Sequence, residues 1–120
     1  MMQVPILKMN DVLIVTLGND ITDDEAIAIK HNILVKIKET ECQGLLIDIS
    51  VVDLIDSFMG RILNEIAEMA KLMGSRTAIT GMSPQVAITM IELGLKLQGV
   101  YTALTVEKGF EWLRNPNTGA

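Results

Sequence analysis

The sequence has few aromatic residues and a single cysteine. Phenylalanine, tryptophan and tyrosine together make up 3% of its 120 residues. Because Cys42 has no second cysteine to pair with, no disulfide can form within the chain, which is typical of a reducing compartment. The first residues, MMQVPILKMND, lack the charged start and the cleavage site of a secretory signal. We therefore expect a cytoplasmic protein.

Positive charge is also scarce. Ten Lys and Arg residues stand against fifteen Asp and Glu residues, so the net charge is -5 and the pI is about 4.7. Nucleic-acid-binding domains and proteins that bind anionic membranes carry basic patches, and none dominates this sequence. The longest charge-free apolar stretch, residues 77–91, is interrupted by glycine and proline and is shorter than the roughly 20 residues of a membrane span. The composition thus argues against nucleic acid and membrane as partners.

Catalytic motifs are missing as well. The sequence contains neither a GxSxG nucleophile elbow nor a glycine-rich phosphate loop. Its single histidine, His31, falls on the polar side of a predicted helix, where a solvated surface residue is expected. We predict no catalytic residue and no cofactor, although a small hydrolase built on Ser57 and Asp56 stays open as an alternative.

Three carboxylates, Asp48, Asp53 and Asp56, lie close together in the sequence and could suggest a magnesium or phospho-acceptor site. A receiver domain also needs a lysine near its last strand, and here the first lysine after that strand is Lys108. We therefore predict no metal site and interpret these acids as loop residues and as favourable charge near a helix start.

The chain has a high apolar content, 49%, and its apolar residues form segments typical of strands that alternate with segments typical of helices. The pattern predicts one α/β domain over residues 1–120, with a mixed, mostly parallel sheet, four helices and a tail from about residue 115. The predicted order is β-β-α-β-α-β-α-β-α. The strands are expected at Ile6–Met9, Val12–Leu17, Gly44–Ile49, Arg76–Thr80 and Tyr101–Ala103, and the helices at 22–39, 57–73, from 83 onwards and from 105 to before 115.

Helix starts are well marked. Thr22 and Glu25 form a capping-box pattern, and Ser83 followed by Pro84 is a strong start signal. In the third helix the polar residues occupy one narrow stripe, so we expect this helix to be either deeply buried or partly used for contacts with a partner.

The stretch IDSFMGRIL, residues 55–63, places a hydroxyl beside a carboxylate where a buried strand leads into a helix. Ser57 is predicted to be the N-cap of this helix. A phosphate at that position would meet the positive end of the helix dipole and also the nearby carboxylates of Asp53 and Asp56. Phosphorylation is therefore expected to change the surface potential with little refolding.

The segment GLLIDISVVDLIDSFMGRIL, followed by KLMGSRTAITGMSPQVAITMIELG, resembles the STAS domain family of anti-sigma-factor-antagonist-like domains. The likeness covers nearly the whole chain. The IDSF sequence, with MAKLMG at residues 69–74 and ITG at 79–81, is similar to the single-domain scaffold subgroup of the bacterial stressosome, the RsbS type. The resemblance implies a STAS fold with the predicted order of elements.

The resemblance also implies a function. Ser57 would be phosphorylated by a serine kinase of the histidine-kinase-like ATPase class, and Asp53, Asp56 and Phe58 would contact that partner. The unphosphorylated scaffold would form homodimers and large assemblies with multidomain STAS paralogues of the RsbR type and would sequester the kinase. Phosphorylation would release the kinase, and a phosphatase would reset the serine.

One departure bears on the subgroup. Many stand-alone antagonists carry Asp-Ser-Ser/Thr-Gly-Leu-Gly, whereas here Phe58 replaces the second hydroxyl residue, Met59 the first glycine and Arg61 the second. This bulkier helix start fits the stressosome subgroup better. A free-standing anti-sigma-factor antagonist regulated by serine phosphorylation remains the alternative within the family.

Overall fold

The computed structural model describes residues 4–115 and confirms the predicted order of elements. Of the predicted C-terminal tail, only Asn115 lies within the described residues. The strands are Ile6–Met9 (β1), Val12–Thr16 (β2), Gly44–Asp48 (β3), Arg76–Thr80 (β4) and Tyr101–Ala103 (β5). The helices are Asp23–Thr40 (α1), Ser57–Leu72 (α2), Pro84–Glu92 (α3) and Val106–Arg114 (α4).

The five strands form one mixed sheet in the order β1-β2-β3-β4-β5. β1 and β2 are an antiparallel hairpin, and its turn includes Asn10, which has a φ of 54°. The remaining pairs are parallel, in a register that sets Val12 beside Gly44 and Gly44 beside Arg76. Every residue of β3 is buried, as its unbroken apolar run predicts for a central parallel strand.

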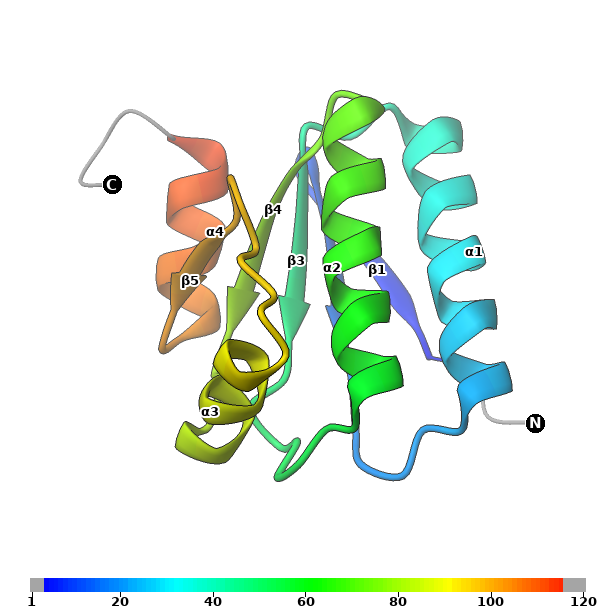
Figure 1. Cartoon of the computed structure of the whole chain (residues 1–120). Coiled ribbons are helices and arrows are strands. Elements are labelled where there is room, and N and C mark those ends of the chain that lie inside the picture. Colours follow the sequence, from blue (N-terminus) through cyan, green and yellow to red (C-terminus); the bar gives the residue numbers. More distant parts are fainter. Residues whose placement is uncertain (1–3, 116–120) are drawn as a thin grey trace.

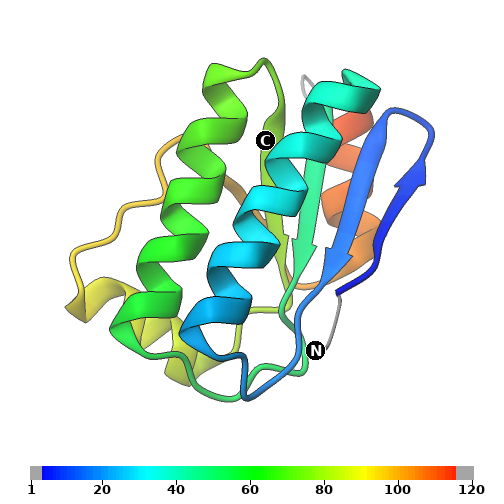
Figure 2. The same cartoon turned by 90° about the vertical axis from the view of Figure 1, so that its right-hand side faces the viewer.

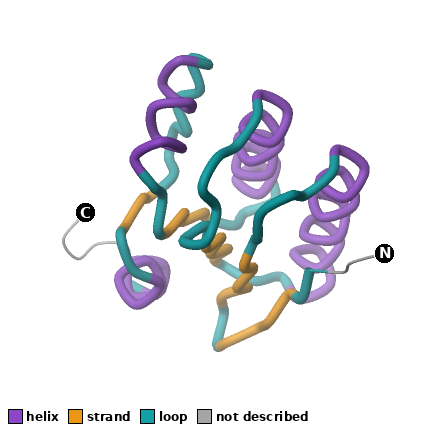
Figure 3. The backbone as a smooth tube through the Cα atoms, turned by 90° about the horizontal axis from the view of Figure 1, so that it is seen from below, coloured by secondary structure: helices purple, strands orange, loops and turns teal. Residues whose placement is uncertain are grey.

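Helices cover both faces of the sheet (Figure 1). α1 and α2 pack on one face, and α4 packs on the other, as the view along the sheet shows (Figure 3). The larger core lies under α1 and α2 and includes Leu13, Ile47, Ile66 and Ile79. The smaller core lies under α4 and is formed by Val12, Leu46, Ala78 and Leu113. Burial of these apolar side chains is the main force that holds the layers together.

Four helices begin at the edge of the sheet where the parallel strands end. The loops from β2 to α1 and from β3 to α2 run side by side there, and α3 follows β4 and α4 follows β5 at the same edge (Figures 1 and 2). α1 begins with the predicted capping box: Thr22 Oγ1 accepts from the Glu25 N–H, and Glu25 Oε1 accepts from the Thr22 N–H. Ser83 caps α3 by accepting from the Val86 N–H at 3.2 Å, also as predicted. This edge therefore gathers helix N-termini and loops.

Helix α3 is not deeply buried. Only Val86 and Met90 of its nine residues are buried, whereas Ile88 and Ile91 are 58% and 77% exposed. Of the two expectations for this helix, the buried one is therefore wrong. Its outer apolar face is open to solvent in the single chain.

Candidate regulatory site at the start of helix α2

Ser57 is the first residue of α2, at the edge where the strands end. Its side chain is exposed, and its hydroxyl has no hydrogen-bond partner among residues 4–115. A hydroxyl that holds no structural contact is free to react. The site is therefore accessible to a modifying enzyme without local unfolding.

The prediction that Ser57 is the N-cap is wrong, because Asp56 occupies that position. Asp56 has an extended backbone with φ -91° and ψ 176°, and its Oδ1 accepts a hydrogen bond from the Met59 N–H at 2.8 Å. Aspartate is among the best N-cap residues, and its charge also suits the positive end of the helix dipole. The sequence-based prediction placed the N-cap one residue too late, because Asp and Ser are both favourable N-cap residues.

Asp53 lies in the loop before α2 and is exposed. The neighbouring β2–α1 loop fixes this part of the chain: Asn19 Oδ1 accepts from the Asp53 N–H at 3.0 Å, and Asn19 Nδ2 donates to the Val51 carbonyl at 2.9 Å. The same amide also donates to Asp53 Oδ2 at 3.4 Å. Asn19 thus ties the β2–α1 loop to the loop that leads to Ser57.

Asp48 differs from Asp53 and Asp56 because it is buried. It is 8% exposed at the end of β3, and its carboxylate accepts from Ser50 Oγ and Thr80 Oγ1, both at 2.8 Å. These bonds satisfy a buried acid and join the ends of β3 and β4. Asp48 is therefore a structural residue of the sheet edge.

Phe58 follows Ser57 and is half-buried, packed against the larger core. Of the four residues predicted to contact a partner, Asp53, Asp56 and Ser57 are exposed on one connection, and Phe58 offers only part of its ring. Phe58 also packs the first turn of α2 against the larger core.

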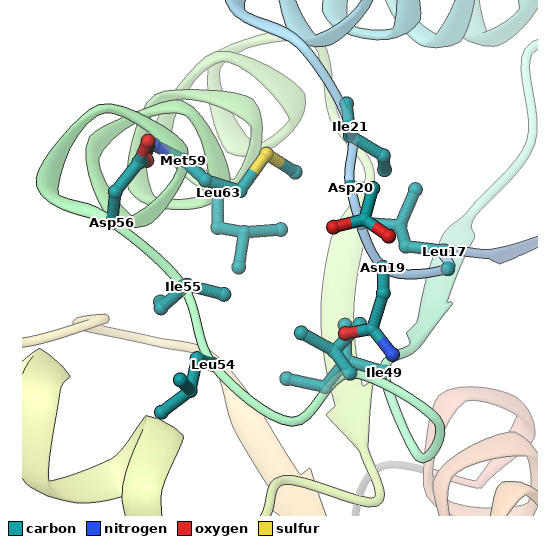
Figure 4. Close-up of a pocket in the computed structure, with 12 residues that line it drawn as sticks. Leu17, Asn19, Asp20, Ile21, Ile49, Leu54, Ile55, Asp56, Met59 and Leu63 are labelled. Carbon is teal, nitrogen blue, oxygen red and sulfur yellow. Dashed lines mark hydrogen bonds between the residues drawn. The ribbon is translucent and has the colours of Figure 1, made fainter.

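A pocket of about 180 Å³ opens between the β2–α1 and β3–α2 loops. Figure 4 shows Asn19 and Asp20 on one side of it, with Ile55, Met59 and Leu63 across from them. Its wall exposes both polar and apolar atoms; the lining residues are Leu17, Gly18, Asn19, Asp20, Ile21, Ile49, Val52, Leu54, Ile55, Asp56, Met59 and Leu63. The pocket and Ser57 therefore share the first turn of α2.

Sequence reasoning missed Asn19 and this pocket. In the sequence, Gly18-Asn19-Asp20 indicates a break after the second strand and offers one acid, Asp20, but a loop contact over more than thirty residues leaves no local pattern. The available signal was topological: loops that follow neighbouring parallel strands meet at the same sheet edge.

His31, the single histidine, is exposed on α1, whereas Ser57 is the first residue of α2. Within residues 4–115, no group of three His, Cys, Asp or Glu side chains is arranged to hold a metal ion. Over the same range, no helix is long and apolar enough to cross a membrane.

Comparison with known proteins agrees with this geometry. The family model of the STAS domain matches residues 3–108. The chain belongs to the STAS domain family. The sequence-based resemblance and the fold that it implied are therefore confirmed.

Two solved structures are similar over almost the full length. A serine-to-glutamate variant of RsbS from Moorella thermoacetica is 40% identical, with a TM-score of 0.87 over 96% of this chain and 97% of that one. A chain in a structure of the stressosome is also 40% identical, with a TM-score of 0.85 over 96% of this chain and all of that one. These matches confirm the likeness to single-domain stressosome proteins.

A curated relative has a longer chain. RsbRA of Bacillus subtilis, described as an RsbT co-antagonist protein, is 28% identical over 101 residues. The match covers 84% of this chain and 37% of that protein. The chain thus spans little more than a third of the length of this relative. The similarity is confined to one region of 101 residues.

Proposed function

We propose that this chain is a non-enzymatic scaffold of a stressosome-like signalling complex, which captures a serine kinase and releases it when Ser57 is phosphorylated. The observation that carries the proposal is the exposed Ser57 hydroxyl, which has no hydrogen-bond partner within the described part of the chain and follows the Asp56 cap, in a chain similar to RsbS. Because Asp56 caps α2, a phosphate on Ser57 would leave that cap in place. The modification would alter charge rather than fold.

The kinase is expected to belong to the histidine-kinase-like ATPase class. In the transfer step, Ser57 Oγ forms a bond to the γ-phosphorus of ATP, the bond between that phosphorus and the bridging oxygen of ADP breaks with its electrons staying on ADP, and the hydroxyl proton passes to a base of the kinase. The new group carries a charge of about -1.5 to -2. It would then lie against the anionic ADP in the active site of the kinase, and the repulsion between these two groups accounts for release of the kinase.

The assembly partners follow from the relatives. We infer that a multidomain STAS paralogue of the RsbR type joins this chain in a large particle, as the likeness to a stressosome chain and to RsbRA supports. The exposed apolar face of α3, with Ile88 and Ile91, offers surface for such contacts, since exposed apolar patches often mark protein interfaces. A phosphatase that hydrolyses phosphoserine would restore the capturing state.

The decisive experiment combines phosphorylation with capture. The purified chain is incubated with its cognate serine kinase and ATP, and the product is mapped by mass spectrometry. Phosphate on Ser57, kinase bound by wild type and by Ser57→Ala, and weak binding by Ser57→Asp are expected. Equal capture of the kinase by all three proteins would contradict the charge switch.

Two further measurements separate the alternatives. In size-exclusion chromatography with an RsbR-type paralogue, a scaffold should elute as a very large particle, whereas a free-standing antagonist should stay small. In ester and phosphoester screens, neither wild type nor Ser57→Ala should show turnover. Turnover that disappears in Ser57→Ala would establish the hydrolase instead.

A further inference from the structure

Arg61 is the basic residue nearest to Ser57 in the sequence. It lies on α2 four residues after Ser57, and both side chains are exposed. Residues four apart on a helix are neighbours on its surface, with about 5–6 Å between their Cβ atoms. The long side chain of Arg61 can therefore reach a group attached to the Ser57 oxygen.

Arg61 is not engaged by another part of the chain. It has no hydrogen bond or ion pair to any of residues 4–115. Glu65, the acid one turn further along α2, is already paired with Lys30 of α1 at 2.9 Å. The guanidinium of Arg61 thus keeps its N–H donors for another acceptor.

The other charges around Ser57 are mostly acidic. Asp53 and Asp56 precede it and are exposed, and Asp20 lies across the pocket from the start of α2 (Figure 4). The helix packed beside α2 begins at the same edge with three acids, Asp23, Asp24 and Glu25. A phosphate on Ser57 would add a charge of about -1.5 to -2 to this group. Without a cation beside it, that phosphate would be repelled by its neighbours.

One other cation comes near this end of α2. The loop after α3 packs against Gly60, and Lys96 is exposed on that loop, whereas α3 itself contributes an acid, Glu92. No helical spacing sets Lys96 against Ser57, and its ammonium lacks the planar fork with which arginine binds phosphate. Arg61 is therefore the better placed of the two.

We propose that Arg61 binds the phosphate of phosphorylated Ser57 and holds it against the first turns of α2. The inference rests on the proposed function and adds the residue that stabilises the modified state. Two parallel N–H···O bonds from a guanidinium fit a phosphate group. The pair offsets the repulsion from Asp53 and Asp56 and draws the phosphate back onto the scaffold, away from the active site of the kinase. Arg61 is thus a positioning residue of the phosphorylated form.

The test uses the full chain with phosphoserine incorporated at position 57 during translation, so that no kinase is needed. Phosphorus NMR follows the second ionisation of the phosphate as a function of pH. A neighbouring cation favours the doubly charged phosphate and lowers its pKa. Arg61→Gln should therefore raise the titration midpoint by about 0.3 pH unit or more, and Arg61→Lys should restore part of the difference. High salt should reduce it.

Two controls each remove one positive charge. Lys71→Gln changes an exposed lysine on the same helix, fourteen residues and about 21 Å from Ser57, which is beyond the screening length of about 8 Å at physiological salt. This variant should leave the midpoint unchanged. Lys96→Gln should shift the midpoint less than Arg61→Gln does. A larger shift for Lys96→Gln would assign the phosphate to the loop after α3 and overturn the proposal.

Thermal melts complete a cycle in which phosphoserine and Arg61→Gln are combined. Phosphoserine at position 57 should lower the melting temperature more in the Arg61→Gln background than in wild type. A structural role of Arg61 that does not involve the phosphate would lower both forms equally and leave the midpoint unchanged, which would contradict the proposal.

Failure of the pair and failure of the proposed function give different results. If the kinase phosphorylates Ser57 but Arg61→Gln leaves the phosphorus titration unchanged, Arg61 does not hold the phosphate and the proposed function stands. If the kinase places no phosphate on Ser57 of the wild-type chain, the proposed function is wrong, and the regulatory role of Arg61 is overturned with it.

Discussion

The Asp56 carboxylate accepts a hydrogen bond from the Met59 backbone N–H at 2.8 Å, so the residue that caps α2 is the neighbour of Ser57 and not Ser57 itself. This separates two roles that the sequence had assigned to one side chain. Asp56 holds the helix start, while the Ser57 hydroxyl is left without a structural contact among the described residues. The proposed phosphorylation of Ser57 would therefore break no hydrogen bond among the described residues.

The cap predicts a clear difference between neighbouring variants. Asp56→Ala should lower the free energy of unfolding by about 1 kcal/mol, because the Met59 N–H loses its acceptor. Ser57→Ala should change it by less than about 0.5 kcal/mol, as is usual for an exposed residue. Urea unfolding of both proteins checks this, with Asp56→Ser as a control that retains a capping oxygen. A larger loss for Ser57→Ala than for Asp56→Ala would show that the serine is the cap.

The capping box of α1 predicts a pH dependence. The hydrogen bond that the Thr22 backbone N–H donates to the Glu25 carboxylate, together with the interaction of that carboxylate with the Thr22 side chain, lowers the pKa of Glu25 below its ordinary value of 4.5. A lowered folded-state pKa means that ionised Glu25 stabilises the protein above the ordinary value and that this contribution is lost as pH falls through the lowered one. Glu25→Gln should therefore melt at a lower temperature than wild type at pH 7.

That difference in melting temperature should shrink as the pH is lowered below about 4.5, because protonated Glu25 then resembles glutamine. The measurement is a series of thermal melts of both proteins from pH 7 into the acid range. Glu39→Gln, near the end of the same helix and outside the capping box, serves as the control. A constant difference at every pH would show that the Glu25 charge plays no part.

Much of this fold could be predicted because its local signals agree with one another. The unbroken run at Gly44–Asp48 and the caps at Thr22 and Ser83 each indicated the element that the structure contains. The site was predicted less completely. Ser57, Asp53 and Asp56 were found on one connection, but the pocket depends on Asn19 bridging two loops, which no local pattern encodes. Long-range loop contacts of this kind follow from topology and appear only once the strands are placed.

The burial of Asp48 predicts that its partners matter for stability. Thr80→Val removes the hydroxyl that donates to Asp48 Oδ1 and leaves this 8% exposed carboxylate with Ser50 as its side-chain donor. Loss of a partner by a buried polar group costs about 1–3 kcal/mol, so a fall of that size in the free energy of unfolding is expected. Thr102→Val, on the exposed side of β5, should be nearly neutral. Equal effects of both variants in urea unfolding would argue against a structural role for the bond.

The close approach of α4 to the sheet gives a further test. A Cβ atom added to Gly109 would lie 2.5 Å from Thr80 Cγ2 and 3.3 Å from Leu46 Cδ1, whereas one added to Gly18 would meet nothing within 4 Å. Alanine favours a helix interior over glycine by about 1 kcal/mol, but overpacking costs about 1–3 kcal/mol, so Gly109→Ala should be destabilising overall. Gly18→Ala should leave the free energy of unfolding nearly unchanged.

The clash can be relieved from the other side. Thr80→Ser removes Cγ2 and keeps the hydroxyl that donates to Asp48, so it should recover stability in the Gly109→Ala background. In the wild-type background the same substitution leaves a small gap under α4 and should be mildly destabilising. The two effects have opposite signs, which makes the pair strongly non-additive in a double-mutant cycle measured by urea unfolding. Additive effects would mean that α4 shifts away from β4 when Gly109 is replaced, and that the close packing of helix on sheet is not required.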